Sequence, residues 1–454
     1  MKNVRSTLGP KAYWVGSIAG IILIWIILLL SVHPSISAAQ EWRALPSAPS
    51  LGQSKKDDIY FVDSDKGWGI SPIAIYHTDD GGATWPRQFK APAFSYLRAI
   101  GFANDQVGWV GDLRNPWLYH TTNGGRSWVV VQLPDDQVGV CGLFVIDEMT
   151  IYGVGVYHGP AHFIKSTDGG VTWSVVDLSP LAGGGVDIHF WNKYEGVLLG
   201  GVLEGGRPRV VILATSDGGT TWEKRFEGSR AGEWGWKFSF PTQDIGYASI
   251  QTEPGSDAPE TEYFLKTVDG GQTWEEKPFW TQSGSQNYSA QGIGFVTPDV
   301  GWIGSWRSNM PTLATTDGGE TWSETDFGRR LNRFRFLSDT LGYASGSTFF
   351  KYSKAVATSL EGSDDISGAF RVSEVYPNPA RFSLTVEVTL TNASQTRIDI
   401  YDLVGRKIDT LEPGMLTSGQ HRINIDVSRY SSGLYFLRLS AGSHRETRKM
   451  VVVN

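Results

Sequence analysis

Short apolar stretches alternate with polar turns along most of this 454-residue chain. Their shortness, and the glycines between them, predict β-strands. One pattern recurs seven times: an apolar strand ends at a phenylalanine, a polar turn follows, and in most copies a glycine and an aromatic residue open the next strand. The phenylalanines are Phe61, Phe102, Phe144, Phe190, Phe240, Phe295 and Phe336.

A second pattern follows six of these copies. It runs Thr/Ser-x-Asp-Gly-Gly-x-Thr/Ser-Trp with small variations, and its tryptophans are Trp85, Trp128, Trp173, Trp222, Trp274 and Trp322, which lie 43 to 52 residues apart. A repeat of this length predicts a β-propeller with one four-stranded blade per repeat. The fold class is therefore all-β, and the seven phenylalanine copies predict seven blades over residues 40–354.

The seventh blade lacks its own last strand in sequence order. After Phe336, residues 348–352 predict a third strand, and no tryptophan box follows it. Residues 41–46 resemble the stretch that follows each box. We therefore expect the N-terminal strand to complete blade seven and to close the ring, which removes the open sheet edges.

The box resembles the Asp-box, or BNR repeat. Its polar position is occupied by Asp80, Asn123, Asp168, Asp217, Asp269 and Asp317. Each side chain is expected to accept hydrogen bonds from its own turn, while the glycines supply positive φ. The alternative is six acidic metal or substrate sites, but one carboxylate per turn is too few ligands for a hard cation. We expect a structural role, with no metal and no cofactor.

The repeat ends before the C-terminus. Residues 355–369 are small and polar and are interpreted as a linker, and residues 370–454 contain short alternating strands, which predict a small Ig-like β-sandwich. The motifs Tyr-Pro-Asn-Pro at 376–379, Ile-Tyr-Asp-Leu-x-Gly-Arg at 400–406 and Ser-Gly-Leu-Tyr-Phe at 432–436 resemble the C-terminal sorting domain of the type IX secretion system. That resemblance implies an export address that binds the secretion machinery and is usually removed. The alternative is an Ig-like adhesion domain.

The N-terminus has the plan of a secretory signal peptide. Lys2, Arg5 and Lys11 precede the apolar residues 12–32, and small residues precede Gln40. Residues 1–39 are therefore interpreted as a signal peptide, the alternative being an uncleaved anchor. This anchor, or attachment at the cell surface, would be the only link to a membrane. The protein is expected to be secreted or held at the outer-membrane surface.

The distribution of charge bears on whether the propeller binds nucleic acid. The net charge is −7. Residues 1–39 carry +3, and residues 370–454 carry 11 basic and 8 acidic residues, so residues 40–369 carry −13. An acidic propeller argues against binding of nucleic acid.

The propeller most resembles the photosystem II assembly and stability factor group. The shared residues are the Phe…Asp…Gly-Trp turn and the Asp-Gly-Gly-x-Thr-Trp box. This resemblance implies a single seven-bladed propeller that binds without catalysis. The enzymatic alternative is a glycosidase. Sialidases share the box, but their Arg-Ile-Pro motif is absent from residues 40–77, and xyloglucanases use two propellers.

A ligand site is expected on the innermost strands, just before each recurrent phenylalanine, where side chains vary on a regular scaffold. The candidate ligand-binding residues are Asp58, Arg98, Asp187, Trp236, Lys237, Gln291 and Arg333. Asp58 and Asp187 are the carboxylates in this register and are expected to face each other across the channel, either as a functional pair or as inert solvated groups. Trp191, Trp234, Trp236 and Trp306 form either a stacking surface for a glycan or protein ligand or packing between blades. Cys141, the one cysteine, is expected to be a buried apolar residue.

Overall fold

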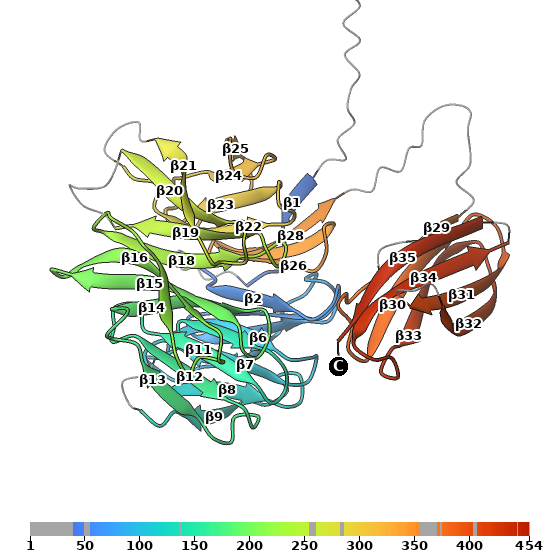
Figure 1. Cartoon of the computed structure of the whole chain (residues 1–454), viewed down its shortest axis with the longest axis horizontal. Helices are drawn as coiled ribbons and strands as arrows, with labels where there is room; N and C mark the ends of the chain where they lie inside the picture. The colour runs from blue at the N-terminus through green and yellow to red at the C-terminus, as the bar shows by residue number, and fades with distance from the viewer. Residues whose placement is uncertain are drawn as a thin grey trace, which may run out of the picture. The chain divides into compact units, whose positions relative to one another are not determined.

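A computed structural model describes residues 40–49, 55–135, 139–253, 260–281, 286–354, 370–372, 375–402, 406–442 and 444–453. All regular elements in these ranges are β-strands (Figure 1). The described residues contain no helix long and apolar enough to cross a membrane. The expected signal peptide, residues 1–39, and the expected linker, residues 355–369, lie outside the described residues.

Seven four-stranded antiparallel sheets form the blades of a propeller. Each blade begins with an inner strand, and each inner strand contacts the next around the ring, with the seventh contacting the first. The inner strands are β2 (Asp58–Phe61), β6 (Leu97–Phe102), β10 (Gly142–Val145), β14 (Gly184–Phe190), β18 (Glu233–Ser239), β22 (Ala290–Phe295) and β26 (Arg333–Phe336). The seven-bladed all-β architecture expected from the repeat is confirmed.

The remaining blade strands follow outward in sequence order. The second strands are β3 (Gly67–Ser71), β7 (Gly108–Asp112), β11 (Ile151–Gly155), β15 (Gly196–Glu204), β19 (Gly246–Thr252), β23 (Gly301–Ser305) and β27 (Leu341–Ser345). The third strands are β4 (Ala74–Thr78), β8 (Trp117–Thr121), β12 (His162–Ser166), β16 (Arg207–Thr215), β20 (Thr261–Thr267), β24 (Thr312–Thr315) and β28 (Phe349–Lys354). The outer strands are β5 (Arg87–Lys90), β9 (Val129–Gln132), β13 (Ser174–Asp177), β17 (Glu223–Glu227), β21 (Glu275–Thr281), β25 (Ser323–Thr325) and β1 (Gln40–Ala44).

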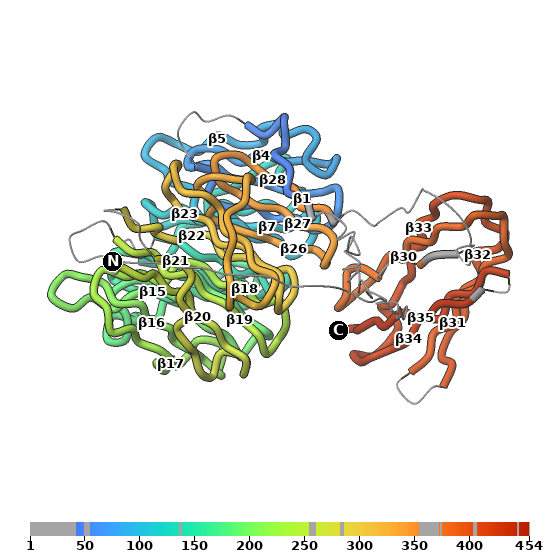
Figure 2. The backbone as a smooth tube through the Cα atoms, turned by 90° about the horizontal axis from the view of Figure 1, so that it is seen from above, coloured from blue at the N-terminus to red at the C-terminus, as the bar shows by residue number. Residues whose placement is uncertain are grey.

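The N-terminal strand closes the ring, as the sequence predicts. Strand β1 pairs antiparallel with β28, and the register places Trp42 opposite Tyr352. Figures 1 and 2 show the two strands side by side. The buried Trp42 side chain lies among rings of blades six and seven, stacked 4.8 Å from Phe327 and edge-on 5.5 Å from Trp302. This blade is therefore held together by contacts between the two ends of the propeller.

The recurrent Phe and Gly-aromatic pattern is a packing device. A Cβ atom added to Gly67 would lie 2.5 Å from the ring of Phe61, and one added to Gly108 would lie 2.3 Å from the ring of Phe102. The phenylalanine at the end of the inner strand covers the first residue of the second strand, and only glycine leaves room for it. The ring then lies in the apolar layer between neighbouring blades, stacked on Trp68 in the case of Phe102.

The Asp-box is a self-contained turn. The carboxylate of Asp217 accepts hydrogen bonds from the backbone N–H and the hydroxyl of Thr221, at 2.9 and 2.6 Å, and from the Thr215 hydroxyl at 2.9 Å. Gly219 has φ +83° and donates its N–H to Thr215, and the Trp222 indole donates to the Gly219 carbonyl at 3.1 Å. The partners of this carboxylate thus come from its own turn.

Asn123 keeps this geometry in the second box. Its amide oxygen accepts from the backbone N–H of Ser127 at 3.0 Å, and its amide nitrogen donates to the Ser127 hydroxyl at 2.9 Å. Asparagine supplies the same acceptor as aspartate without a charge, so the turn persists without a carboxylate. Among the described residues no group of three or more His, Cys, Asp or Glu side chains is placed to hold a metal ion.

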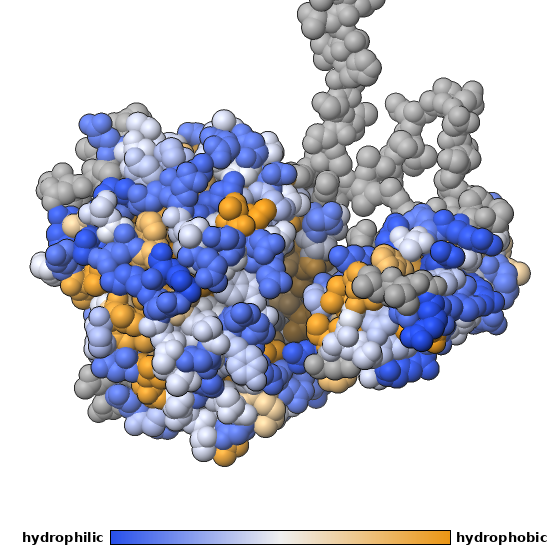
Figure 3. Space-filling model, in the orientation of Figure 1, coloured by the Kyte–Doolittle hydropathy of each residue, from blue (hydrophilic) through white to orange (hydrophobic). Residues whose placement is uncertain are grey.

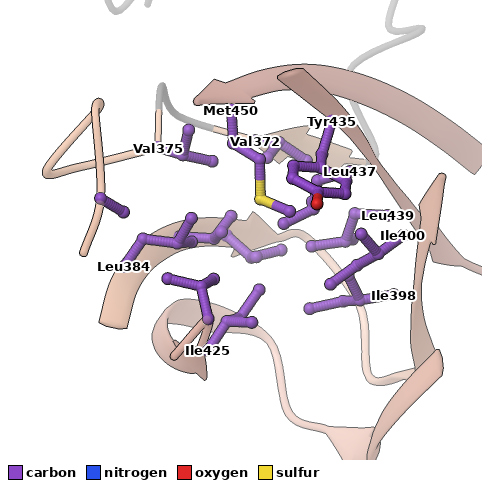
Figure 4. Packing of buried hydrophobic residues seen from close by; sticks show 14 of the residues in the cluster. Val372, Val375, Leu384, Ile398, Ile400, Ile425, Tyr435, Leu437, Leu439 and Met450 are labelled. Atoms are coloured by element: carbon purple, nitrogen blue, oxygen red, sulfur yellow. The ribbon is translucent and has the colours of Figure 1, made fainter. Parts of the chain in front are cut away.

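The C-terminal residues form a β-sandwich. One sheet contains β29 (Phe370–Val372), β30 (Ser383–Leu390) and β33 (Gly419–Asp426), and the other contains β32 (Lys407–Leu416), β31 (Ser394–Asp402), β34 (Gly433–Ala441) and β35 (His444–Val452). Alternate residues of both sheets meet in one apolar core, where Leu384, Ile400, Leu437 and Met450 converge (Figure 4). The two sheets therefore bury the inward face of each strand, as an Ig-like sandwich does.

The visible surface of the molecule is mainly hydrophilic, with apolar residues scattered over it (Figure 3). A scattered distribution is ordinary for a surface in contact with water. Among the described residues, Phe94 is the most exposed large apolar side chain, at 86%, and it has a φ of +69°.

Candidate ligand-binding site on the propeller axis

The inner strands carry their polar side chains toward the axis of the propeller. All seven candidate residues from the sequence lie on these strands and are at most 6% exposed; they are Asp58, Arg98, Asp187, Trp236, Lys237, Gln291 and Arg333. They come from six of the seven blades and form two connected layers. Blade three supplies none of the seven candidates. The corresponding position in that blade is Cys141, which directly precedes β10 and is fully buried with a free thiol.

The first layer is centred on Arg333. Its two terminal nitrogens donate to the two oxygens of Asp187, at 2.6 and 2.9 Å, and its Nε lies 3.2 Å from Asp58 Oδ1. Asp187 also accepts from the backbone N–H of Phe238 at 2.9 Å, and Lys237 Nζ lies 3.7 Å from it. Asp58 and Asp187 therefore do face a common space, but one guanidinium fills it and binds both.

Electrostatics keep Asp187 ionised. Burial alone would raise the pKa of Asp187, but the charges of Arg333 and Lys237 outweigh it and hold the pKa well below its usual range. A general acid for glycoside cleavage needs the opposite, a carboxyl whose pKa is raised so that it holds a proton. Asp58 and Asp187 in this arrangement are thus ion-pair partners of Arg333.

The second layer lies where the inner strands begin. Arg98 donates to Asp57 Oδ1 at 3.1 Å, while Lys55 donates to the side-chain oxygens of Gln291, at 2.6 Å, and Asn332, at 3.3 Å. These contacts join blades one, two, six and seven across the axis.

An indole covers this layer. Trp236 donates its Nε1–H to Asn332 Oδ1 at 2.9 Å. Its ring lies 5.3 Å from the guanidinium of Arg98 and 5.7 Å from the ammonium of Lys55, both cation–π contacts.

Sequence reasoning missed three members of this network: Lys55, Asp57 and Asn332. Asp57 and Asn332 lie four residues before Phe61 and Phe336, the same position as the candidates Arg98, Trp236 and Gln291, but they were not selected. The run of two lysines and two aspartates at 55–58 is the signal that could have found two of them. The signal for Asn332 is its register position, four residues before Phe336, which matches that of Gln291 before Phe295.

Aromatic and polar residues extend the second layer toward the surface. Tyr157, which is half-buried, makes edge-on contacts with Trp234 and Trp236 at 5.9 and 5.7 Å. The Trp234 indole donates to Glu253 at 2.9 Å, and the guanidinium of Arg307 lies 5.5 Å from the half-buried Trp306 ring. We refer to Tyr157, Trp234, Trp236, Trp306 and Arg307 as the channel mouth.

Trp191 does not belong to the channel mouth, so the expected group of four tryptophans is corrected to three. It follows the end of β14, packs edge-on against Phe240 at 5.1 Å, and lines a depression with residues of the Asp-box turns such as Asp269. Because inner strands run from the channel mouth toward the Asp-box side, a residue after Phe190 must lie at the far end.

Two family models match separate parts of the chain. Residues 374–453 match the family described as secretion system C-terminal sorting domain. The chain ends in a type IX sorting domain. The protein is therefore secreted or held at the cell surface, as the sequence predicts. Residues 36–145 match the family described as photosynthesis system II assembly factor YCF48, which bears out the resemblance of the propeller to that group.

Solved structures share the propeller fold. One is YCF48 bound to D1 peptide, with 18% sequence identity and a TM-score of 0.50 over 69% of this chain and 96% of that one. Another is YCF48 from Cyanidioschyzon merolae, with 17% identity and a TM-score of 0.51 over 69% of this chain and 98% of that one. The GH74 xyloglucanase from Xanthomonas campestris is also similar, with 12% sequence identity and a TM-score of 0.53 over 77% of this chain and 60% of that one. At these identities the likeness shows the fold alone. No curated protein sequence matches the chain.

Proposed function

We propose that this protein is an exported, non-catalytic binding protein whose propeller takes a glycan or protein ligand at the channel mouth. The observation that carries the proposal is the second axial layer: cationic and amide groups from several blades lie under Trp236, with further aromatic side chains around it. Aromatic rings beside fixed polar groups suit sugar rings and peptide side chains alike.

Peptide binding has one further support. YCF48, whose fold is similar, has been solved bound to D1 peptide. A propeller of this fold can therefore bind a peptide. The tail of our protein places it outside the cell or on its surface, so we infer a role there, with a ligand of its own.

The proposal is tested by screening the purified protein against glycan and peptide arrays and then measuring affinity for each hit. Tyr157→Ala and Arg307→Ala should each weaken binding about tenfold or more, because they remove ring and charge contacts at the channel mouth. Trp191→Ala is the matched control, since it removes an aromatic side chain at the opposite end. Binding that survives both mouth variants but is lost with Trp191→Ala would overturn the proposed location.

The second candidate is a glycoside hydrolase of the sialidase or xyloglucanase-like class. The observation in its favour is the fold likeness to a GH74 xyloglucanase. The ion pairs of Asp58 and Asp187 with Arg333 count against these two carboxylates as a catalytic pair. Hydrolysis of xyloglucan or sialosides by the purified protein, abolished by Asp187→Asn at unchanged stability, would establish this candidate in place of the first.

We further propose that residues 1–39 are a cleaved signal peptide and that residues 370–454 fold as a unit separate from the propeller at 40–354, joined by the linker at 355–369. In this scheme the tail binds the type IX secretion machinery and is then removed. The shared apolar core of the two tail sheets supports an independent unit. Mass spectrometry of the exported protein tests both: an N-terminus at Met1 or a C-terminus at Asn454 would contradict cleavage at that end.

A further inference from the structure

The outward face of one tail sheet carries a group of positive charges. On the neighbouring strands β34 and β35, core residues alternate with outward side chains, and Arg438, Arg445 and Lys449 are exposed residues of the outward set. The strand register places Arg438 opposite Thr447, diagonally between the other two cations. Diagonal neighbours on a sheet lie about 7–8 Å apart. The three cations therefore form one group.

The carboxylates on this face are bound to other cations. Asp399 on β31 is directly opposite Arg438, but its carboxylate lies 3.0 Å from Arg397 Nε and 3.5 Å from Lys407 Nζ. Glu412 on β32 lies 3.5 Å from Arg397. Both carboxylates are thus already held by cations of β31 and β32.

The three grouped cations have no acid of their own. The guanidinium of Arg438 lies 4.7 Å from the centroid of the Tyr401 ring, a cation–π contact. Among the described residues, Arg438, Arg445 and Lys449 form no ion pair, whereas the neighbouring Arg448 binds Glu446 at 2.6 Å. The outward face as a whole has five cations against the two carboxylates of Asp399 and Glu412. We refer to these cations as the basic face: Arg397, Lys407, Arg438, Arg445 and Lys449.

The stability of the fold does not explain this grouping. Like charges that are exposed to water repel each other only weakly, and exposed ion pairs contribute little. A group of unpaired cations does create a positive potential, which attracts an acidic partner and orients it. The grouping therefore indicates a role in association.

The outward face of the other tail sheet gives an internal comparison. The outward positions of β30 and β33 carry one cation, Arg422, and two carboxylates, Glu387 and Asp426. Arg422 Nε lies 2.8 Å from Glu387 Oε1, so its charge is compensated. Within the described tail strands, the excess of positive charge thus belongs to one side of the sandwich.

Two aromatic rings favour a protein as the partner of the basic face. Tyr401 and Phe436 are opposite each other on β31 and β34, and both are half-buried among the cations. Aromatic side chains and arginine are enriched in protein interfaces, whereas a membrane-binding surface inserts exposed apolar side chains into the lipid. The match of the tail to a sorting domain supplies such a protein partner, the secretion machinery.

We propose that the basic face docks the tail onto an acidic protein surface of the type IX secretion machinery. This inference rests on the proposed function, in which the tail binds that machinery, and it adds the face that is used and the charge of the partner. Carboxylates of the partner pair with Arg438, Arg445 and Lys449, and the partner covers the rings of Tyr401 and Phe436.

The test is export of the full chain from a host with type IX secretion, followed by fractionation and immunoblotting. Melting curves of each purified variant check that it folds. The variant Arg438→Gln/Arg445→Gln/Lys449→Gln should lower the exported fraction on the order of tenfold, because it removes the unpaired charges that attract the partner. The variant Arg438→Lys/Arg445→Lys/Lys449→Arg keeps the charges and should be exported normally.

The matched control is Arg381→Gln/Arg422→Gln/Arg429→Gln, which removes the same number of charges from the tail outside the basic face and should be exported normally. If the glutamine variant of the basic face does not fold, Thr447→Glu takes its place. The new carboxylate is opposite Arg438, where a cross-strand ion pair is compatible with the sheet. It should lower export because it reduces the positive potential of the face.

Normal export of the folded glutamine variant, or an equal loss in the control variant, would overturn the proposal. Normal export of a chain without residues 370–454 would instead refute the sorting role of the tail, so the two failures are distinguishable. Sedimentation of the purified full chain with vesicles separates a protein from a lipid. Binding to phosphatidylglycerol but not to phosphatidylcholine, lost in the glutamine variant, would assign the face to an anionic membrane and overturn the protein partner. Equal lack of binding to both supports the protein.

Discussion

Replacing Trp42 by alanine tests the closure of the ring most directly. Trp42 is buried and has five aromatic neighbours with ring centroids 4.8 to 6.0 Å away. A buried tryptophan removes roughly 200 Å² of surface from water, worth about 5 kcal/mol at ~25 cal/mol per Å². Tryptophan-to-alanine substitutions in cores cost about 3–5 kcal/mol. We expect Trp42→Ala to lower the free energy of unfolding by about 4 kcal/mol.

The location of Trp42 adds a second effect. Strand β1 is held to β28 by the ladder between them and by side-chain packing, so a weakened Trp42 contact should release the strand before the rest of the propeller unfolds. Equilibrium urea unfolding measures the stability loss. Hydrogen exchange of β28 amides measures the release of β1, which should appear as exchange faster than in the core strands.

Trp322→Ala is the control. Trp322 is a box tryptophan that packs against Phe264 and Phe295, but its blade is continuous in sequence. It should cost stability without selective exchange in β28. A loss below about 1 kcal/mol in Trp42→Ala, together with unchanged exchange in β28, would refute the reasoning that this contact closes the ring.

Three further predictions follow from the turns, a buried carboxyl and the tail. Asp217→Ala should lower the melting temperature, and Asp217→Asn should lower it less, because asparagine keeps the acceptor for Thr221; equal losses would contradict the role of that acceptor. Burial raises the pKa of Glu262 from 4.5 to about 7 although backbone N–H groups bind it, so the folded chain keeps a proton that the unfolded chain loses. Its contribution to stability should be complete below pH 4.5 and lost as the pH rises through 7, and Glu262→Gln should flatten this part of a melting-temperature profile. Removing residues 370–454 should leave the propeller folded but retained by a host with type IX secretion, as fractionation and immunoblotting would show; normal export would remove the sorting role.

The blade architecture was predictable because it depends on short-range rules repeated many times. The turn at Asp217 is satisfied by residues within four positions of it, and Gly67 packs against Phe61 only six residues away. The tail was predicted less completely, as short alternating strands without bounds. Strand β32 (Lys407–Leu416) could not be delimited, because most of its residues are partly or fully exposed and lack a clear alternation of apolar and polar positions.

The sequence predicts where the site lies, but it does not predict which charged side chains form ion pairs there. A fixed register on the inner strands brings Asp58, Asp187 and Arg333 to one axis. It does not reveal that Arg333 binds both carboxylates, because that depends on the width of the ring and the rotamer of a long side chain. Lys55 lies outside the register, in the segment before β2, and the direction of its side chain depends on the tertiary structure.

The pairing of β1 with β28 also orders the assembly of the molecule in time. The first strand of the propeller must wait for a partner more than three hundred residues later in the chain. During synthesis and export, every blade before the seventh can form from neighbouring segments, whereas the ring stays open until the last strand has arrived. An incomplete chain therefore leaves β1 without its partner, and a free strand edge is prone to pair with other chains. A truncated propeller should thus be more prone to aggregate than the loss of a few C-terminal residues suggests.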